Sequence, residues 1–230
     1  MSKYKEVKTG VIGIGSMGQN HVRHYSKLSN LIGVADPDEN VGRATAEKYG
    51  IVWYRNHKDL LKKVDAITIS APTKFHLEVA KDAAELGVNI LVEKPLSNNY
   101  KNAKKIIEIS DQFNINLSVG HIERYNSVTQ FLKKFITENN CGQIFSLTSR
   151  RFSSYPVRIS DVGVSFDLTI HDVDLMRYLL GSEVSSVYAQ GGYFKSKYFE
   201  DFTSVVLNFN KQLFATCHTD WVSQTKVRDL

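Results

Sequence analysis

The chain is poor in cysteine, and Cys141 and Cys217 lie far apart without a C-x-x-C spacing or a histidine at ligand spacing. This pattern signals neither a disulfide framework nor a zinc site, so we expect no metal. The sequence also lacks any run approaching the roughly 20 apolar residues that cross a bilayer. Its first residues lead into a predicted strand rather than a signal peptide, so we expect a cytoplasmic protein.

Charge of one sign is not concentrated in any segment. The formal net charge is +5, but residues 1–121 hold 17 Lys and Arg against 13 Asp and Glu, and residues 122–230 hold 12 against 11. A nucleic-acid-binding protein would more often gather its excess charge in one basic stripe. We therefore expect neither nucleic acid nor membrane as a partner, and the mild positive bias suits an anionic cofactor.

The first half of the sequence alternates short apolar runs with segments of helical spacing. The runs indicate buried parallel strands at residues 7–14, 30–35, 66–70, 89–93 and 117–121. Helices are expected between them at residues 16–28, 39–49, 74–86 and 97–113, the last capped by Ser97. Short connections in such an alternation predict an α/β domain with a doubly wound parallel sheet over residues 1–121.

After residue 121 the pattern changes. We expect helices at residues 126–138 and 167–180, and strands at residues 144–151, 184–192, 202–209 and 213–221. They predict a second domain over residues 122–230, of α+β class with an open, mostly antiparallel sheet. No further element is expected after residue 221 to close this sheet, so we expect that a C-terminal portion is missing.

A G-x-G-x-x-G turn, Gly13-Ile14-Gly15-Ser16-Met17-Gly18, lies between the first predicted strand and the first predicted helix. Gly13 permits a tight turn, Gly15 lets the backbone approach a pyrophosphate, and Gly18 lets the helix pack closely on the strand. The helix N-terminus adds N–H groups and the positive end of a dipole. The alternative is a tight turn that binds no ligand.

The second predicted strand ends at Asp36, 18 residues after Gly18. A carboxylate in this place can accept hydrogen bonds from the ribose hydroxyls of adenosine, although it could also simply cap the segment after Pro37. Because a carboxylate repels a ribose 2′-phosphate, we expect NAD rather than NADP. Arg43 could oppose this preference by reaching a 2′-phosphate.

Two other segments carry groups suited to oxidising an alcohol. Lys94 follows the predicted strand 89–93, at the carboxyl edge of the sheet where ligands bind in such folds, and its ammonium can stabilise a developing alkoxide. On the predicted helix 167–180, His171 can take a hydroxyl proton, and Asp167, one turn earlier, can orient it or share the proton. The alternatives are an ordinary exposed lysine and a solvated helix face.

Four motifs occur in an order known from one family: the glycine turn, Ala71-Pro72-Thr73-x-x-His76, Glu93-Lys94-Pro95 and Asp167-x-x-x-His171-Asp172-x-Asp174. With them the chain resembles the glucose-fructose oxidoreductase and inositol dehydrogenase family, Gfo/Idh/MocA, over nearly its whole length. The resemblance implies a Rossmann domain, a catalytic lysine at Lys94 and an acid-base pair at Asp167 and His171. We assign cofactor contacts to Gly13, Gly15, Ser16, Met17, Gly18, Asp36, Pro72, Thr73, His76, Glu93 and Lys94.

Residues 120–126 and 150–164 resemble the UDP-N-acetylglucosamine 3-dehydrogenase branch of that family, whose members oxidise the sugar 3-hydroxyl to a ketone. Arg151 and Arg158 could then pair with a diphosphate, because guanidinium groups match phosphate oxygens, although they could also be surface arginines. The segment Glu123-Arg124-Tyr125-Asn126 could line the substrate site together with His171. Equally, Glu123 and Arg124 could form a structural ion pair.

Together these inferences predict hydride transfer from a sugar carbinol carbon to NAD, at a site between the two domains. A dehydrogenase of inositol or of a free sugar is one alternative, and a non-catalytic NAD-binding regulator is another. We expect a homodimer or homotetramer, because exposed faces of antiparallel sheets often pair between subunits. The aromatic residues of the second domain agree with this expectation: Tyr188, Tyr193, Phe194, Tyr198, Phe199 and Phe202.

Overall fold

The computed structural model describes residues 6–156, 162–210 and 212–230. The chain forms two compact units, residues 1–120 and residues 121–230, and each unit has its own sheet and its own core. Within the described residues, the helices are all too short or too polar to span a membrane.

A six-stranded sheet in the order β3-β2-β1-β4-β5-β6 forms the centre of the first unit, and its neighbouring strands are parallel. Its strands are β1 (Lys8–Ile12), β2 (Asn30–Ala35), β3 (Val52–Tyr54), β4 (Ala66–Ile69), β5 (Asn89–Val92) and β6 (Leu117–Val119). Its helices are α1 (Ser16–Leu28), α2 (Glu39–Tyr49), α3 (His57–Leu61), the 3-10 turn η1 (Thr73–Phe75), α4 (His76–Glu85) and α5 (Tyr100–Gln112). The predicted doubly wound parallel sheet is confirmed.

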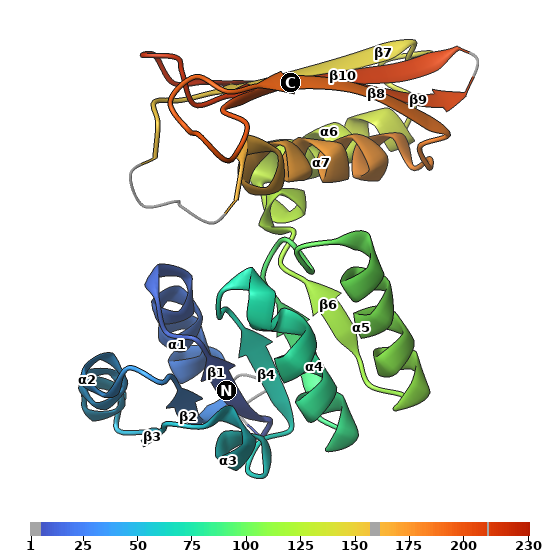
Figure 1. The fold of residues 1–230 in the computed structure, drawn as a ribbon. Helices are drawn as coiled ribbons and strands as arrows, with labels where there is room; N and C mark the ends of the chain where they lie inside the picture. The colour runs from blue at the N-terminus through green and yellow to red at the C-terminus, as the bar shows by residue number, and fades with distance from the viewer. Residues whose placement is uncertain (1–5, 157–161, 211) are drawn as a thin grey trace. The chain divides into compact units, whose positions relative to one another are not determined.

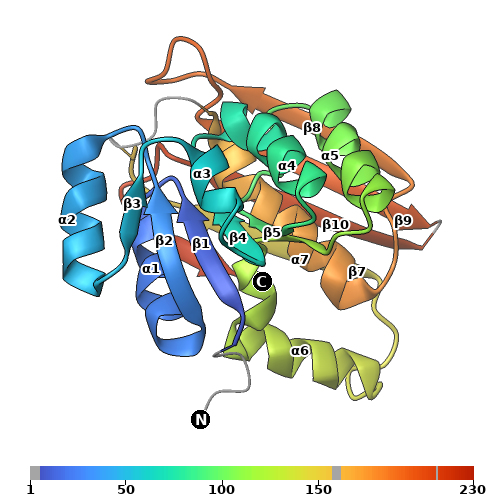
Figure 2. The same cartoon turned by 90° about the horizontal axis from the view of Figure 1, so that it is seen from below.

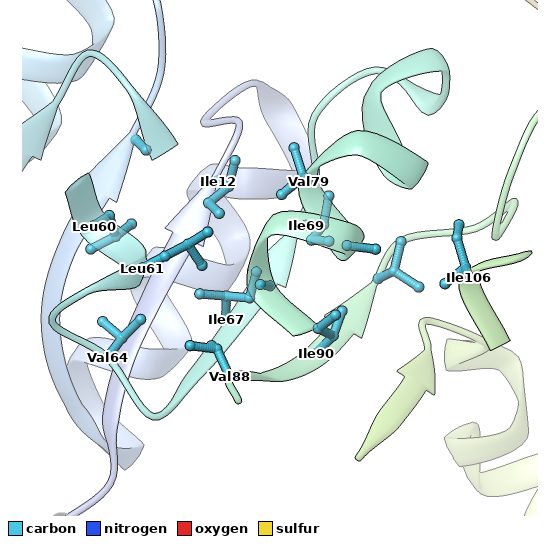
Figure 3. Close-up of a cluster of buried hydrophobic side chains, with 14 residues drawn as sticks. Ile12, Leu60, Leu61, Val64, Ile67, Ile69, Val79, Val88, Ile90 and Ile106 are labelled. Atoms are coloured by element: carbon cyan, nitrogen blue, oxygen red, sulfur yellow. The ribbon is translucent and has the colours of Figure 1, made fainter. Parts of the chain in front are cut away.

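Helices cover both faces of this sheet (Figures 1 and 2). Successive strand residues point to opposite faces, so Val11 of β1 packs with Val22 of α1, whereas its neighbour Ile12 belongs to the cluster on the other face. That second cluster, drawn in Figure 3, joins Ile12 to Leu60 of α3 and Ile106 of α5. Burial on both faces is the reason that the strands read as continuous apolar runs.

Two local features of the first unit differ from the sequence prediction. The short elements β3 and α3 were not expected, because three and five residues are too few to show a period. The predicted cap of α5 at Ser97 is wrong: Asn99 is the N-cap, and its side-chain oxygen accepts the N–H of Asn102 at 2.9 Å. Asparagine in extended backbone caps as well as serine does, so the two candidates could not be separated by residue type.

The second unit contains a five-stranded sheet in the order β11-β7-β10-β9-β8. Its strands are β7 (Ser146–Phe152), β8 (Ser186–Gly192), β9 (Phe202–Asn210), β10 (Leu213–Asp220) and β11 (Val227–Asp229). Its helical segments are η2 (Ile122–Tyr125), α6 (Ser127–Thr137), η3 (Ser165–Thr169) and α7 (Ile170–Leu180). The pairs are antiparallel except β7 with β10, so the predicted α+β class with a mostly antiparallel sheet is confirmed.

The expectation of no element after residue 221 is wrong, because β11 pairs with β7 at one edge of the sheet. Both α6 and α7 lie on one face of this sheet (Figure 1). Met176 of α7 and Leu207 of β9 are buried in the core between the helices and the sheet. On β8, by contrast, Val187 and Tyr188 are both more than half exposed.

Candidate active site

The glycine turn connects β1 to α1, and two of its glycines are required by the geometry. Gly13 has φ +82°, and a Cβ there would lie 2.4 Å from the backbone nitrogen of Ala71. A Cβ on Gly18 would lie 2.0 Å from the carbonyl oxygen of Gly13. A Cβ on Gly15, by contrast, would meet nothing within 4 Å. The first two positions therefore build the turn, whereas position 15 borders open space that a ligand can use.

The start of α1 fits an anionic ligand. Gly15 is the N-cap and has no side chain to cap the helix, while Ser16 and Met17, the first two helical residues, are exposed. The first N–H groups of a helix have no partner within the helix, and they form the positive end of its dipole. A pyrophosphate of a dinucleotide would satisfy them.

The carboxylate of Asp36 ties the end of β2 to the glycine turn. One oxygen accepts the N–H of Ile14 at 2.8 Å, and the other accepts the N–H of Asp38 at 2.9 Å. The residue is only partly buried, and each carboxylate oxygen has a second lone pair. Asp36 therefore combines the structural role with free acceptor capacity for ribose hydroxyls.

A charged cluster that the sequence did not reveal lies beside Asp36. Glu39 pairs with Arg43 at 2.8 Å and also with Arg55. The guanidinium groups of both arginines lie over the ring of Trp53, at 5.1 and 5.7 Å from its centroid, and the indole N–H of Trp53 donates to the Asp36 carbonyl at 2.9 Å. Arg43, anticipated as a possible 2′-phosphate ligand, is thus partly neutralised by Glu39.

Lys94 lies at the carboxyl edge of the sheet, two residues after β5 ends, and its peptide bond to Pro95 is cis. The preceding Glu93 is buried, and His21 Nε2 of α1 lies 2.7 Å from its Oε1. Although burial raises the pKa of Glu93, the hydrogen bond from His21 and the backbone N–H of Lys94 outweigh it and hold the pKa below its ordinary value. His21 was missed at the sequence level, because nothing in its spacing separates it from other helical histidines.

His76, the first residue of α4, connects two turns of the candidate site. It is buried, with Nε2 2.9 Å from the carbonyl oxygen of Ala71 and Nδ1 3.1 Å from that of Pro95. It therefore joins the turn that holds Pro72 and Thr73 to the turn that holds Lys94. Its contacts fix the backbone, and any contact of His76 with a cofactor stays a prediction.

In the second unit, Asp167 and His171 lie on either side of a change in helix type. The regular helix expected from residue 167 is wrong in its first turn: residues 165–169 form the π-helix η3, and the α-helix α7 begins at Ile170. The hydroxyl of Thr169 lies 2.9 Å from that of Thr203 and 2.5 Å from that of Thr219, which anchors this turn to β9 and β10. Single-turn π-helices are often found at functional sites. His171 is buried and Asp167 is half-buried.

Arg151 on β7 has two carboxylate partners beneath α7. Its Nη2 lies 2.6 Å from Oδ1 of Asp172, and its Nη1 lies 3.4 Å from Oε1 of Glu123, which also pairs with Arg228. Burial alone lowers the pKa of Arg151, but the hydrogen bond and charge of Asp172 raise it above its ordinary value. A contact of Arg151 with a diphosphate stays a prediction, and Arg158 lies outside the described residues.

The remaining candidates of the segment 123–126 have separate partners. Arg124 forms two hydrogen bonds with Asp174, at 2.8 and 2.5 Å, and not the pair with Glu123 considered from the sequence. Tyr125 is exposed, and the side chain of Asn126 caps α6 by accepting the N–H of Val128 at 3.0 Å. Glu123 and Arg124 therefore attach this segment to β7 and α7 through different contacts.

One group of His57, Glu78 and Asp82 has potential metal ligands within 4.8 Å of one another. His57 Nε2 already lies 2.7 Å from Oδ2 of Asp82, and Lys58 Nζ lies 3.3 Å from its Oδ1. These contacts describe an ion-pair cluster between α3 and α4. We assign it no role at the candidate active site.

Two family profiles match the chain, and the matched regions cover most of each unit. Residues 7–121 match the profile described as oxidoreductase family, NAD-binding Rossmann fold, and residues 129–229 match the GFO/IDH/MocA C-terminal domain. The fold is also similar to that of the UDP-N-acetylglucosamine 3-dehydrogenase from Acidithiobacillus ferrooxidans, with a TM-score of 0.89 and 29% identity over 97% of this chain and 72% of that one.

Relatives with different substrates show comparable sequence similarity. The chain is 33% identical over 185 residues to the UDP-N-acetylglucosamine 3-dehydrogenase of Acidithiobacillus ferrooxidans, and 30% identical over 195 residues to the myo-inositol 2-dehydrogenase of Thermotoga maritima. Each alignment covers 80% of this chain but 58% of the relative, so the chain spans less than two thirds of their length. From the match of both units, the chain belongs to the Gfo/Idh/MocA family of oxidoreductases, with an NAD-binding Rossmann domain.

Proposed function

We propose that the chain acts as an NAD-dependent dehydrogenase that oxidises a hydroxyl-bearing carbon of a sugar. The observation that carries the proposal is the position of Lys94, at the carboxyl edge of a parallel sheet and in the same unit as the glycine turn. Ligands of doubly wound sheets bind at this edge. NAD, when bound, would accept the hydride.

The chain's own residues would manage the proton and the developing charge. In this proposal Lys94 donates a hydrogen bond to the substrate hydroxyl and stabilises the alkoxide as it forms. His171 removes the hydroxyl proton, and Asp167 orients the imidazole or shares the proton. The buried position of His171 limits the access of water to that proton.

For the substrate we propose a nucleotide sugar such as UDP-N-acetylglucosamine, oxidised at its 3-hydroxyl. The 33% identity to the Acidithiobacillus ferrooxidans enzyme and the likeness of residues 120–126 and 150–164 support this choice. The test is incubation of the protein with NAD and UDP-N-acetylglucosamine, following NADH absorbance and a 3-keto product by mass spectrometry. NADH formation without this product, or with free sugars only, would reject the nucleotide-sugar assignment.

The roles of Lys94 and His171 are tested by removing each side chain. We expect Lys94→Ala and His171→Ala to lower turnover by about 10²- to 10⁴-fold. The Kd for NAD should stay within about threefold in His171→Ala, and in Lys94→Ala it should rise by much less than turnover falls. Lys104→Ala, an exposed lysine paired with Glu108 on α5, is the matched control and should retain full turnover. Wild-type turnover in both active-site variants would contradict the assignment.

A second candidate function is a dehydrogenase of inositol or a free sugar. The two carboxylate partners of Arg151 favour it, because a guanidinium that already pairs with Asp172 and Glu123 is less able to bind a diphosphate. Comparing kcat/KM for myo-inositol, scyllo-inositol and UDP-N-acetylglucosamine separates the two. NAD binding without turnover of any candidate would instead indicate a non-catalytic regulator.

We also propose that the exposed side of the second sheet pairs between subunits in a dimer or tetramer. Tyr188 of β8, which pairs with Val206, and Phe214 of β10, which pairs with Asn208, are both exposed on this side, opposite the face that carries the buried Leu207. Light scattering of the purified protein measures the mass of the assembly. If the protein is monomeric at micromolar concentration, this part of the proposal fails.

A further inference from the structure

His21 lies on the helix that follows the glycine turn, three residues after Gly18. Its Nε2 lies 2.7 Å from Oε1 of Glu93, and the two side chains are 17% and 11% exposed. The other carboxylate oxygen of Glu93 accepts the backbone N–H of Lys94 at 3.3 Å. One buried carboxylate thus connects α1 to the turn that carries Lys94.

The site around Glu93 leaves little freedom for another arrangement. A Cβ on Gly120, just after β6, would lie 3.1 Å from Oε2 of Glu93, so the carboxylate is enclosed from that side as well. A buried carboxylate that loses its partner is destabilised in its charged form and becomes easier to protonate. The titratable and charged groups that face Glu93 are His21 from α1 and Lys94 in its own turn.

We propose that His21 is a positioning residue: by donating to Glu93 it holds the Glu93-Lys94-Pro95 turn against α1, whose N-terminus would bind the cofactor pyrophosphate. His21 touches neither substrate nor cofactor in this role and acts through Glu93. The kinetic part of the proposal rests on the proposed dehydrogenase function, whereas the contact with Glu93 does not. The geometry thereby couples the cofactor helix to the lysine that would bind the substrate hydroxyl.

Three variants test this coupling. His21→Leu removes the donor, His21→Gln retains an N–H donor at a similar reach, and His24→Leu changes an exposed histidine of the same helix as the matched control. The ionisation of Glu93 is followed by ¹³C NMR of labelled glutamate carboxyls, with its resonance identified by its loss in Glu93→Gln. This measurement needs no turnover.

We expect the Glu93 titration midpoint to rise by about one pH unit or more in His21→Leu, less in His21→Gln, and not at all in His24→Leu. If the wild-type protein oxidises a sugar, kcat should fall about ten- to a hundredfold in His21→Leu. In a plot of kcat against pH, the decline on the acidic side should also begin at higher pH in this variant. His21→Gln should recover most of kcat, and the Kd for NAD should change by less than about threefold. An unchanged Glu93 titration in His21→Leu would overturn the proposal.

A double variant keeps the test decisive if His21→Leu alone is poorly folded. In a Glu93→Leu background the acceptor of the proposed interaction is removed, so adding His21→Leu should change stability and kcat little further. A further large loss in the double variant would show that His21 acts independently of Glu93 and would also overturn the proposal. Absence of turnover in the wild-type protein would reject the dehydrogenase function alone, because the NMR titration still tests the contact.

Discussion

The guanidinium of Arg151 and the carboxylate of Asp172 form a buried ion pair directly beside His171, with Nη2 and Nε of the arginine 2.6 and 3.1 Å from Oδ1. Asp172 is 2% exposed, and its charge is compensated first by the hydrogen-bonded Arg151 and to a smaller extent by Arg228. The pair connects β7 to α7 at the residue after the proposed base. Its loss should therefore affect both the stability and the geometry of the second unit.

We predict that Arg151→Met lowers the free energy of unfolding by about 3–5 kcal/mol, because it leaves the Asp172 charge buried and unpaired. Urea unfolding followed by circular dichroism measures this change. The neighbouring Arg150, paired with Asp229 at the surface, is the matched control, and Arg150→Met should cost at most about 1 kcal/mol. An equal decrease in the free energy of unfolding in the two variants would show that the buried pair stabilises the fold no more than the surface pair.

Two glycine variants should separate the fold of the cofactor turn from its binding function. Gly18→Ala should destabilise the first unit, because its Cβ would lie 2.0 Å from the carbonyl oxygen of Gly13. Gly15→Ala should leave the melting temperature nearly unchanged and weaken NAD binding by about tenfold or more, because its Cβ enters open space beside α1. Thermal unfolding and calorimetric titration with NAD measure the two effects. Tight NAD binding by folded Gly15→Ala would argue against binding of the cofactor at the glycine turn and the start of α1.

Asp36→Asn should shift the cofactor preference towards NADP. The substitution removes a negative charge from the residue hydrogen-bonded to Trp53, over whose ring Arg43 and Arg55 lie. The ratio of kcat/KM for NAD over NADP should fall about tenfold, equivalent to about 1.4 kcal/mol. Asp38→Asn, which retains an oxygen acceptor at the cap of α2, serves as the control. An Asp36→Asn variant with the wild-type ratio would mean that this carboxylate does not discriminate between the two cofactors.

Stability should depend on the protonation of His121, which follows β6. Burial lowers the pKa of His121, and Arg124 and Arg177 add to this effect, although Asp174 opposes it. The unfolded chain therefore binds more protons than the folded chain as the pH falls below about 6.5, so the free energy of unfolding should decrease in that window.

His121→Gln removes this titration, so its free energy of unfolding should decline less between pH 7 and pH 5.5. Denaturant unfolding at several pH values measures the two slopes. His24→Gln, at an exposed position of α1, should retain the slope of the wild-type protein. A His121→Gln variant whose slope equals that of the wild-type protein would contradict the assignment.

Local patterns were sufficient for the architecture and for the candidate residues. Alternation of apolar runs with helical segments predicted both sheets, because the period of a pattern records which sides of an element are buried. The glycine turn was readable because the φ of +82° at Gly13 and the close approach of Gly18 to the Gly13 carbonyl are local to one strand-turn-helix unit. Residues 52–61 were missed because elements of three and five residues are shorter than the period that identifies them.

The sequence by itself determined the family, the doubly wound sheet and the place of Lys94 just after the strand 89–93, because these depend on local order along the chain. Only the tertiary structure decided which side chains contact one another. His21 meets Glu93 72 residues later, and Arg151 meets Asp172 21 residues later. The physical reason is that strand order and helix packing bring such groups together, whereas residue type and spacing alone do not specify which buried charges will pair.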